Sequence, residues 1–300
     1  MIKSAVFPVA GLGTRFLPVT KSVAKELMPI LSKPIIQYAV SECLEIGVER
    51  LILVTSRLKV PLIDYLEYDR NLERTLEQMG KYEQLEAVRN ILPADFPLVS
   101  VRQQQPRGLG DAVLCARPVI GDEPFVLILP DDLLVSDSKE ATSPLKQMLN
   151  LYQRNEQSVV AVEHVSPSDI SSYGVVDPLT VPEDPKAPFS VRGLVEKPDP
   201  SQAPSQWGIV GRYILSPDIF QHLEQESRFL KGLDNPPELQ LTSALDKLAP
   251  DVTALPLNCH RYDCGSQSGF LKANLAVAAQ DPELKEELRQ FVQQHLGLST

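Results

Sequence analysis

The sequence predicts an α/β protein built on an open sheet with helices on its faces. Two observations support this prediction. Short apolar runs of strand length alternate with amphipathic segments of helix length along most of the 300 residues, the pattern of strands joined by crossover helices. Hydrophobic residues make up 43% of the chain, which is enough for a large core. We expect residues 1–300 to form a single domain, because α/β chains of this length are often undivided.

The first half of the chain alternates between the two patterns. Residues 2–9 are a continuous apolar run, typical of a buried strand, and residues 35–46 are amphipathic and stop at Gly47, which predicts a helix. Further strands are expected at 51–55 and 98–103. The charged segment between them, 58–91, has apolar residues at helical spacing and is predicted to be a helical excursion from the sheet.

The second half continues the alternation. A helix is expected to start at 111–116, and the apolar run at 125–129 is typical of a central parallel strand. The remaining predicted elements are strands at 158–162, 190–195, 208–215 and 252–257 and polar C-terminal helices at about 267–297. The proline-rich segments 178–188 and 199–206 are interpreted as loops between strands and not as domain linkers.

Charge and composition exclude several function classes. Acidic residues outnumber basic ones by 39 to 29, a net charge of −10, which argues against a nucleic-acid partner. The four cysteines show no C-x-x-C spacing, so we expect reduced thiols and no zinc site. No apolar run approaches about 18 residues, and the start of the chain does not resemble a signal peptide. We therefore expect a soluble, cytoplasmic protein with no membrane partner.

The apolar run at 2–9 leads into a glycine loop followed by basic residues. Gly11 and Gly13 allow a left-handed backbone and close approach to a ligand, and successive N–H groups beside Arg15 and Lys25 form a cradle for phosphate. The loop is not a Walker motif, and Phe16 stands where a dinucleotide fingerprint has its third glycine. On these residues alone, a phosphate site and an ordinary turn with solvated cations remain equally open.

Two carboxylates follow the strand at 125–129. Ligands in open α/β sheets lie beyond the carboxyl ends of strands, and Asp131 and Asp132 at that position are costly unless a positive group binds them. A hard divalent cation that also binds phosphate oxygens is the natural partner. Because neighbouring side chains diverge, we expect one of the two to face the ligand; the alternative is that both cap a helix.

Eight segments in register resemble one known family. They are PVAGLGTRFLPVTK, KPIIQYAVSECLEIG, GLGDAVLCARPVIGDEPFVLILPD, YGVVD, VEKP, IVGRYIL, LQLTSALD and YDCG. The chain resembles the sugar-nucleotide pyrophosphorylases, and within that family the bacterial uridylyltransferases that act on glucose 1-phosphate. The resemblance implies a Rossmann-like open mixed sheet of the nucleotide-diphospho-sugar transferase type. It also implies transfer of a uridylyl group from UTP to glucose 1-phosphate, forming UDP-glucose and pyrophosphate, with Mg²⁺ as cofactor.

The resemblance also implies roles for individual residues. The implied catalytic residues are Arg15, Lys25, Asp131 and Lys197, and the implied metal ligands are Asp131 and Asp263. The implied nucleotide-binding residues are Ala10, Gly11, Gly13, Thr14, Gln103 and Gly108. The implied sugar-phosphate residues are Gly174, Glu196, Lys197, Gly211 and Glu238. Independently of the family, the Gln103 amide offers a donor and an acceptor that suit the imide edge of uracil, although the residues alone favour an ordinary loop glutamine.

The chain departs from the family pattern at several positions. Ala24 replaces the proline before the signature lysine, Asp111 stands where members usually have histidine or another residue, and Pro236-Pro237 replaces a glycine segment. The loop 104–107 also differs from the usual lysine-containing version. Three interpretations therefore remain: the uridylyltransferase, a sister enzyme specific for dTTP or another sugar, and a non-catalytic regulatory paralogue. The resemblance further implies a homodimer or homotetramer.

Overall fold

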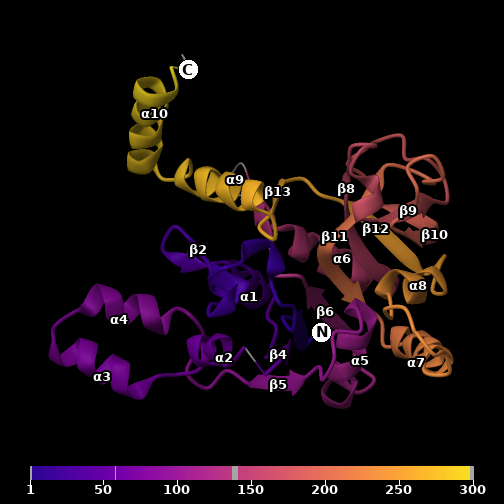
Figure 1. Ribbon diagram of the computed structural model, residues 1–300, viewed down its shortest axis with the longest axis horizontal. Helices are drawn as coiled ribbons and strands as arrows, with labels where there is room; N and C mark the ends of the chain where they lie inside the picture. The colour runs from indigo at the N-terminus through magenta and orange to yellow at the C-terminus, as the bar shows by residue number, and fades with distance from the viewer. Residues whose placement is uncertain (1, 58, 137–140, 298–300) are drawn as a thin grey trace.

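A computed structural model describes residues 2–57, 59–136 and 141–297 of the chain. Its main sheet has nine strands within these residues, in the spatial order β5-β4-β1-β6-β11-β8-β12-β10-β9 (Figure 1). These strands are β1 (Ser4–Pro8), β4 (Arg50–Thr55), β5 (Leu98–Arg102), β6 (Phe125–Ile128), β8 (Ser158–His164), β9 (Gly174–Pro178), β10 (Phe189–Glu196), β11 (Trp207–Leu215) and β12 (Val252–Pro256). The expected open mixed sheet is confirmed.

The sheet divides into a parallel half and a mixed half. Strands β5, β4, β1 and β6 are parallel neighbours, so their carboxyl ends meet at one edge of the sheet. Strand β11 runs antiparallel to β6 and β8, while β12 is parallel to β8. The predicted site residues that follow β1, β5 and β6 are therefore brought to a common edge.

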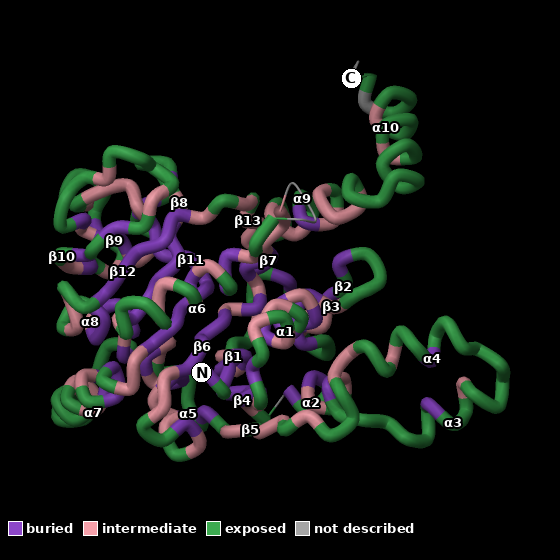
Figure 2. Tube along the Cα trace, turned by 180° about the vertical axis from the view of Figure 1, so that it is seen from behind, coloured by how far each residue is buried: buried purple, intermediate pink, exposed green. Residues whose placement is uncertain are grey.

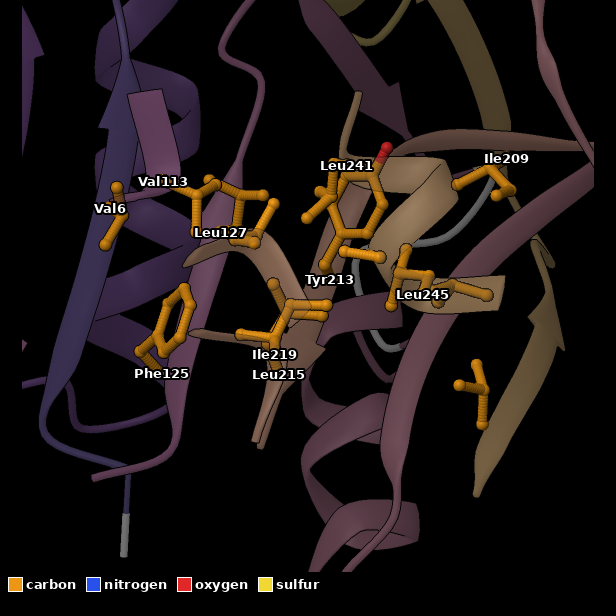
Figure 3. Packing of buried hydrophobic residues seen from close by; sticks show 14 of the residues in the cluster. Val6, Val113, Phe125, Leu127, Ile209, Tyr213, Leu215, Ile219, Leu241 and Leu245 are labelled. Atoms are coloured by element: carbon orange, nitrogen blue, oxygen red, sulfur yellow. The ribbon is translucent and has the colours of Figure 1, made fainter. Parts of the chain in front are cut away.

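Helices cover both faces of this sheet. The helices are α1 (Ile35–Glu45), α2 (Val60–Leu66), α3 (Arg70–Gln78), α4 (Tyr82–Arg89), α5 (Leu109–Ile120), α6 (Pro144–Asn155), α7 (Ile219–Leu230), α8 (Leu241–Asp246), α9 (Gln267–Ala278) and α10 (Pro282–Leu296). Strand side chains alternate between the two faces. Val6 packs in a core with helices α5, α7 and α8 (Figure 3), whereas Ala5 and Phe7 pack on the other face with α1, α2 and α6.

Two helical arms extend from this body. Figure 2 shows α3, α4 and α10 as largely exposed segments away from the buried sheet. The segment 58–91, predicted to be a helical excursion, contains α2, α3 and α4 in its described residues, and Leu58 lies outside them. Among the residues that the structure describes, no helix combines the length and apolar character needed to span a bilayer.

A small antiparallel pair of strands lies beside the main sheet. Strand β7 (Asp132–Val135) pairs with β13 (His260–Asp263), so that Asp263 is the register partner of Asp132. A second short pair, β2 (Pro29–Ile30) and β3 (Lys33–Pro34), follows the glycine loop. A separate apolar cluster that includes Ile30, Leu133 and Ala273 joins both pairs to α9. This cluster brings the segment after the glycine loop and the C-terminal YDCG segment to the end of β6.

Local differences from the expected elements have identifiable causes. Helix α5 begins at Leu109, two residues before the expected start, because Gly108 with φ 100° forms its N-cap. Helix α6 was not expected, although Ser143 caps it by accepting a hydrogen bond from the Lys146 N–H and Pro144 occupies its first turn. Strands β7 and β13 are four residues each, too short for periodicity to reveal.

The buried side chain of Arg212 connects strand β11 of the main sheet to helix α1 and to the start of strand β7. It is 1% exposed and forms a bidentate ion pair with Glu42, at 2.8 and 2.7 Å. Its remaining N–H groups donate to the carbonyl oxygens of Leu129, Gly211 and Asp132 at 3.2, 3.1 and 2.9 Å. One guanidinium thereby holds α1, β11 and the residues that follow β6.

We predict that Arg212→Ala lowers the free energy of unfolding by about 3–5 kcal/mol, because it leaves a largely buried carboxylate and three carbonyls without their donor. Urea denaturation measures the change. The control is Arg228→Ala, whose side chain is 78% exposed and 3.7 Å from Glu224; it should cost less than about 0.5 kcal/mol. Equal effects of the two substitutions would contradict the assigned role of Arg212.

Candidate active site

The glycine loop leaves the carboxyl end of β1 and turns back on itself. Gly13 has φ 66°, and the Thr20 hydroxyl donates to its carbonyl oxygen at 2.8 Å. A Cβ at Gly13 would lie 3.2 Å from both the Lys25 and the Thr20 side chains, so the loop packs closely on the segment that carries Lys25. Arg15 follows in a short 3₁₀ turn, with its side chain 71% exposed and its Nη1 3.9 Å from Asp263 Oδ2.

Lys25 forms an ion pair with Asp131, with 2.6 Å between Nζ and Oδ2. Burial alone lowers the pKa of Lys25, but the carboxylates of Asp131, Glu26 and Asp263 outweigh burial and raise that pKa above its ordinary value. Burial alone raises the pKa of Asp131, but the Lys25 ammonium, its hydrogen bond and Arg15 outweigh burial and lower it. Both groups are therefore charged at neutral pH.

The neighbouring carboxylate, Asp132, faces a different set of partners. It is 8% exposed, and it accepts hydrogen bonds from Gly211 N at 2.8 Å and from Arg261 Nε at 2.8 Å. Burial raises the pKa of Asp132, an effect that Arg261 only partly offsets. Arg261 also donates through Nη1 to the Glu163 carboxylate and, at 3.2 Å, to the Tyr173 hydroxyl. The two acids after β6 thus diverge, as expected for adjacent residues.

Asp263 reaches the same place from the end of β13. Its Oδ1 accepts a hydrogen bond from Gly265 N at 2.8 Å, and Cys264 N donates to the Asp131 carbonyl oxygen at 2.7 Å. A Cβ at Gly265 would lie 2.9 Å from Asp263 Oδ1, 3.1 Å from Asp131 Oδ2 and 3.5 Å from Arg15 Nη1. Gly265 therefore keeps open a small space on which two carboxylates and a guanidinium converge.

A second set of polar side chains lies at the end of strand β10. Glu196 Oε2 accepts a hydrogen bond from Thr242 Oγ1 at 2.6 Å, and Glu196 Oε1 lies 3.3 Å from Lys197 Nζ. Lys197 has φ 44°, a left-handed conformation that is uncommon for a residue with a Cβ and that occurs preferentially at functional positions. A Cβ on Gly174 would lie 2.8 Å from Thr242 Oγ1 and 3.3 Å from Glu196 Oε2, so only glycine fits beside this pair.

A cavity of about 350 Å³ connects the two polar groups. Its lining includes the sequence-predicted residues Arg15, Asp131, Gly174, Glu196, Lys197, Gly211, Glu238 and Asp263. They come from seven separate parts of the chain and include both carboxylates and cations. Such a cavity suits an anionic, hydroxyl-rich ligand whose charge must be neutralised locally.

The predicted base-reading residues lie at the start of α5. Gln103 follows β5, is 8% exposed, and donates through Nε2 to Asp111 Oδ2 at 2.8 Å and to the Gly108 carbonyl oxygen at 3.2 Å. Gly108 has φ 100°, and a Cβ there would lie 2.6 Å from the Leu239 carbonyl oxygen. Glycine is required at this position by both backbone conformation and space.

Residues 5–280 match the model of a protein family described as nucleotidyl transferase. The chain belongs to the nucleotidyl transferase family. It is 40% identical over 297 residues to the UTP–glucose-1-phosphate uridylyltransferase of Bacillus subtilis (strain 168), covering 97% of this chain and 96% of that protein.

Two solved structures are similar to this nucleotidyl transferase over nearly its whole length. A UTP-bound UGPase from Acinetobacter baumannii is 39% identical with a TM-score of 0.86, covering 98% of this chain and 100% of that one. A UDP-glucose pyrophosphorylase complexed with UDP-glucose is 40% identical with a TM-score of 0.80, covering 94% and 100% of the two chains.

The structure of this nucleotidyl transferase does not place every predicted site residue in the cavity lining. Ala10, Gly11, Gly13, Thr14, Lys25, Gln103 and Gly108 lie outside it. Lys25 nevertheless contacts the cavity through its ion pair with Asp131, and Gly108 precedes Leu109, which lines it. These residues follow the carboxyl ends of β1 and β5, which lie at the same edge of the sheet as the end of β6; β1 is the neighbour of β6, and β5 is two strands beyond β1.

Three residues of this site were not expected from the sequence. Thr242, Arg261 and Tyr173 line the cavity. Thr242 donates a hydrogen bond to the predicted carboxylate Glu196, Arg261 donates to Asp132, and the Tyr173 hydroxyl accepts from Arg261. Thr242 lies in the LQLTSALD segment and Arg261 immediately precedes YDCG, so the quoted motifs bracketed both positions. Nothing in their local pattern indicates that they contact acids 46 and 129 residues away.

The donor set fits a divalent cation, which members of this family generally use. Among the described residues, no three histidine, cysteine or acidic side chains form a complete metal cage. A hard cation that completes its shell with water and phosphate oxygens needs only one or two carboxylates from the protein, however. Asp131 and Asp263, which converge on the space beside Gly265, provide such a pair.

We predict that Lys25→Met raises the pKa of Asp131 above the ordinary carboxyl value of 3.8, because burial then acts without the ammonium that opposes it. In the unaltered protein the lowered pKa stabilises the folded state above pH 3.8, and this contribution is lost only as the pH falls below that value. Carboxyl ¹³C NMR titration of aspartate-labelled protein measures the Asp131 titration midpoint in the unaltered protein and in Lys25→Met. Lys21→Met, which removes an exposed lysine nearby, should leave the midpoint unchanged.

Proposed function

We propose that the chain transfers a uridylyl group from UTP to glucose 1-phosphate, forming UDP-glucose and pyrophosphate. The observation that carries this proposal is a single cavity lined by two polar groups. The first group is Asp131, Asp263 and Arg15, which converge beside Gly265, and the second is Glu196 and Lys197. One group suits a triphosphate with its cation, and the other suits a sugar phosphate. The names of the full-length relatives, and of the UTP-bound and UDP-glucose-bound neighbours, support the same substrates.

The proposed reaction joins two polyanions, so the protein acts mainly by positioning and charge neutralisation. An oxygen of the sugar phosphate attacks the α-phosphorus of UTP in line and displaces pyrophosphate. Arg15, exposed at the end of the glycine loop, would hold the leaving phosphates together with the amides of Ala10, Gly11, Gly13 and Thr14. Lys25, held in its charged form, would stay beside the triphosphate.

Mg²⁺ is the cation that we propose for Asp131 and Asp263. When bound, it would screen the charge of the α-phosphate during attack. The protein's own contribution is to hold both carboxylates ready. The Cys264 N–H donates to the Asp131 main chain, and the Gly265 N–H donates to the Asp263 side chain.

The sugar phosphate would bind at the end of β10. Glu196 offers carboxylate oxygens to sugar hydroxyls, and the Lys197 ammonium, 55% exposed, is free to turn toward the incoming phosphate. Gly174 leaves room for the hexose ring, and Gly211 and Glu238 belong to the wall of the same cavity. The strained backbone of Lys197 fits this role, because it aims the side chain away from the course of the strand.

Several wider properties belong to the same proposal. The continuous sheet and its two shared cores support a single nucleotidyltransferase domain over residues 1–300. We also propose a cytoplasmic enzyme that forms a homodimer or homotetramer. Exposed apolar side chains on α9 and α10, such as Leu271 and Phe291, support an oligomer, because burying them against a second copy would be favourable.

The test of this proposal is pyrophosphate release with Mg²⁺, crossing UTP, dTTP, ATP, CTP and GTP against glucose 1-phosphate and galactose 1-phosphate. We expect strong turnover only with UTP and glucose 1-phosphate. Asp131→Asn should lower kcat by more than about 100-fold, because it removes the ionised ligand of the cation. The control Asp122→Asn, at a side chain that is 93% exposed, should retain full activity.

Other outcomes of this assay have definite meanings. Preference for another nucleotide or sugar would make the chain a sister enzyme of altered specificity. Absence of turnover with every pair would favour a non-catalytic regulatory paralogue. Normal kcat in Asp131→Asn would refute the proposed cation site.

We further predict that Thr242→Val raises KM for glucose 1-phosphate about tenfold, because Glu196 loses the short hydrogen bond that fixes its carboxylate. KM for UTP should change less than about twofold, since Thr242 contacts the sugar-side carboxylate and not the phosphate loop. Thr242→Ser keeps the hydroxyl and should restore the original KM. Steady-state kinetics with each substrate varied in turn measures both constants; a similar rise in both would assign Thr242 a merely structural role.

A further inference from the structure

The contacts of Gln103 limit what its amide can offer to a ligand. The side chain is buried, and its main-chain N–H is fixed to the Thr55 carbonyl oxygen at 2.9 Å. Its amide nitrogen lies between Asp111 Oδ2, at 2.8 Å, and the Gly108 carbonyl oxygen, at 3.2 Å. Both neighbours can only accept hydrogen bonds, so the amide end that faces them must be the NH₂ group.

This arrangement occupies both amide hydrogens of Gln103. The hydrogen-bonding capacity that remains is that of the carbonyl oxygen, Oε1, which is purely an acceptor. Rotating the amide by half a turn would place Oε1 against the Asp111 carboxylate and the Gly108 carbonyl, bringing electronegative atoms together. The orientation is therefore imposed by the surroundings.

Asp111 is itself held on a rigid support. It lies in the first turn of α5, where a carboxylate is stabilised by the helix dipole. The start of that helix is anchored to the segment that follows Pro237: Gly110 N donates to the Leu239 carbonyl oxygen at 2.9 Å, and Leu239 N donates to the Arg107 carbonyl oxygen at 2.7 Å. The space around Gly108 and Gly110 is too small for a Cβ at either position. The helix start therefore cannot easily shift to release Gln103.

We propose that Asp111 is a positioning residue that makes Gln103 an acceptor-only reader of the base. This inference rests on the proposed function, in which Gln103 faces the nucleobase. Uracil and thymine present a donor at N3, which an acceptor such as Oε1 can bind. Cytosine presents an acceptor at N3, which would face Oε1 without a hydrogen between them. Asp111 thus contributes to selecting imide bases over cytosine without contacting the base.

The experiment compares the unaltered protein with Asp111→Asn, which has nearly the same shape but can either donate to or accept from Gln103. Calorimetry measures the equilibrium binding of UTP, dTTP and CTP with Mg²⁺ and without sugar phosphate, so no turnover is needed. We expect the affinity for CTP to rise, narrowing the UTP-to-CTP affinity ratio about five- to tenfold, the effect of one hydrogen bond between neutral groups. The UTP-to-dTTP ratio should stay constant, because both bases carry the same imide.

Controls separate this role from general damage to the fold. Asp122→Asn, which makes the same change just after the other end of α5, should leave all three affinities unchanged. A structural defect in Asp111→Asn would weaken all three nucleotides together, whereas the proposed role predicts tighter binding of CTP. An unchanged UTP-to-CTP ratio, or a uniform loss of affinity, would overturn the inference and leave the proposed function intact. Failure of the unaltered protein to bind any nucleotide would overturn both.

Discussion

The structure depends on keeping two adjacent carboxylates ionisable at the buried end of β6. Burial alone raises the pKa of both Asp131 and Asp132, so each needs cationic partners. These partners come from distant parts of the chain: Lys25 from the segment after the glycine loop, Arg261 from β13, and Arg212, through main-chain carbonyls, from β11. Because both acids need cationic partners, the segment after the glycine loop, the main sheet and the C-terminal strand β13 all meet at the end of β6.

Asp131 and Asp132 are both buried, but their charges are compensated by different kinds of partner. Asp132 is buried among fixed donors, and its raised pKa is consistent with a structural role in holding Arg261 and Gly211. Asp131 is held ionised by an ammonium on a flexible stem, which can move when a cation and phosphate oxygens arrive. This difference explains how one member of an Asp-Asp pair can bind a ligand while the other supports the wall of the cavity.

More of the fold than of the candidate site could be predicted from the sequence. Apolar periodicity located the main strands, and the rule that ligands lie at the carboxyl ends of strands pointed to the pair Asp131 and Asp132, from which the family resemblance selected Asp131. The partners of each functional carboxylate could not be predicted in this way. Thr242 on Glu196 and Arg261 on Asp132 are contacts between residues far apart in sequence, set by the order of strands in the sheet. The position of Asp111 beside Gln103 depends on a helix start set two residues earlier than periodicity indicated.

Residues 238–242 connect the two sides of the cavity mechanically. Leu239 fixes the start of α5, and with it Gly108 and Asp111, through main-chain hydrogen bonds. Three residues later, Thr242 fixes the carboxylate of Glu196 on the sugar side. Main-chain contacts at Leu239 and one short side-chain bond at Thr242 thus act within four residues of each other. The Asp111 that holds the Gln103 amide and the Thr242 that holds the Glu196 carboxylate are therefore both supported by this short segment, so that in the proposed function it would orient the base side and the sugar side of the same cavity.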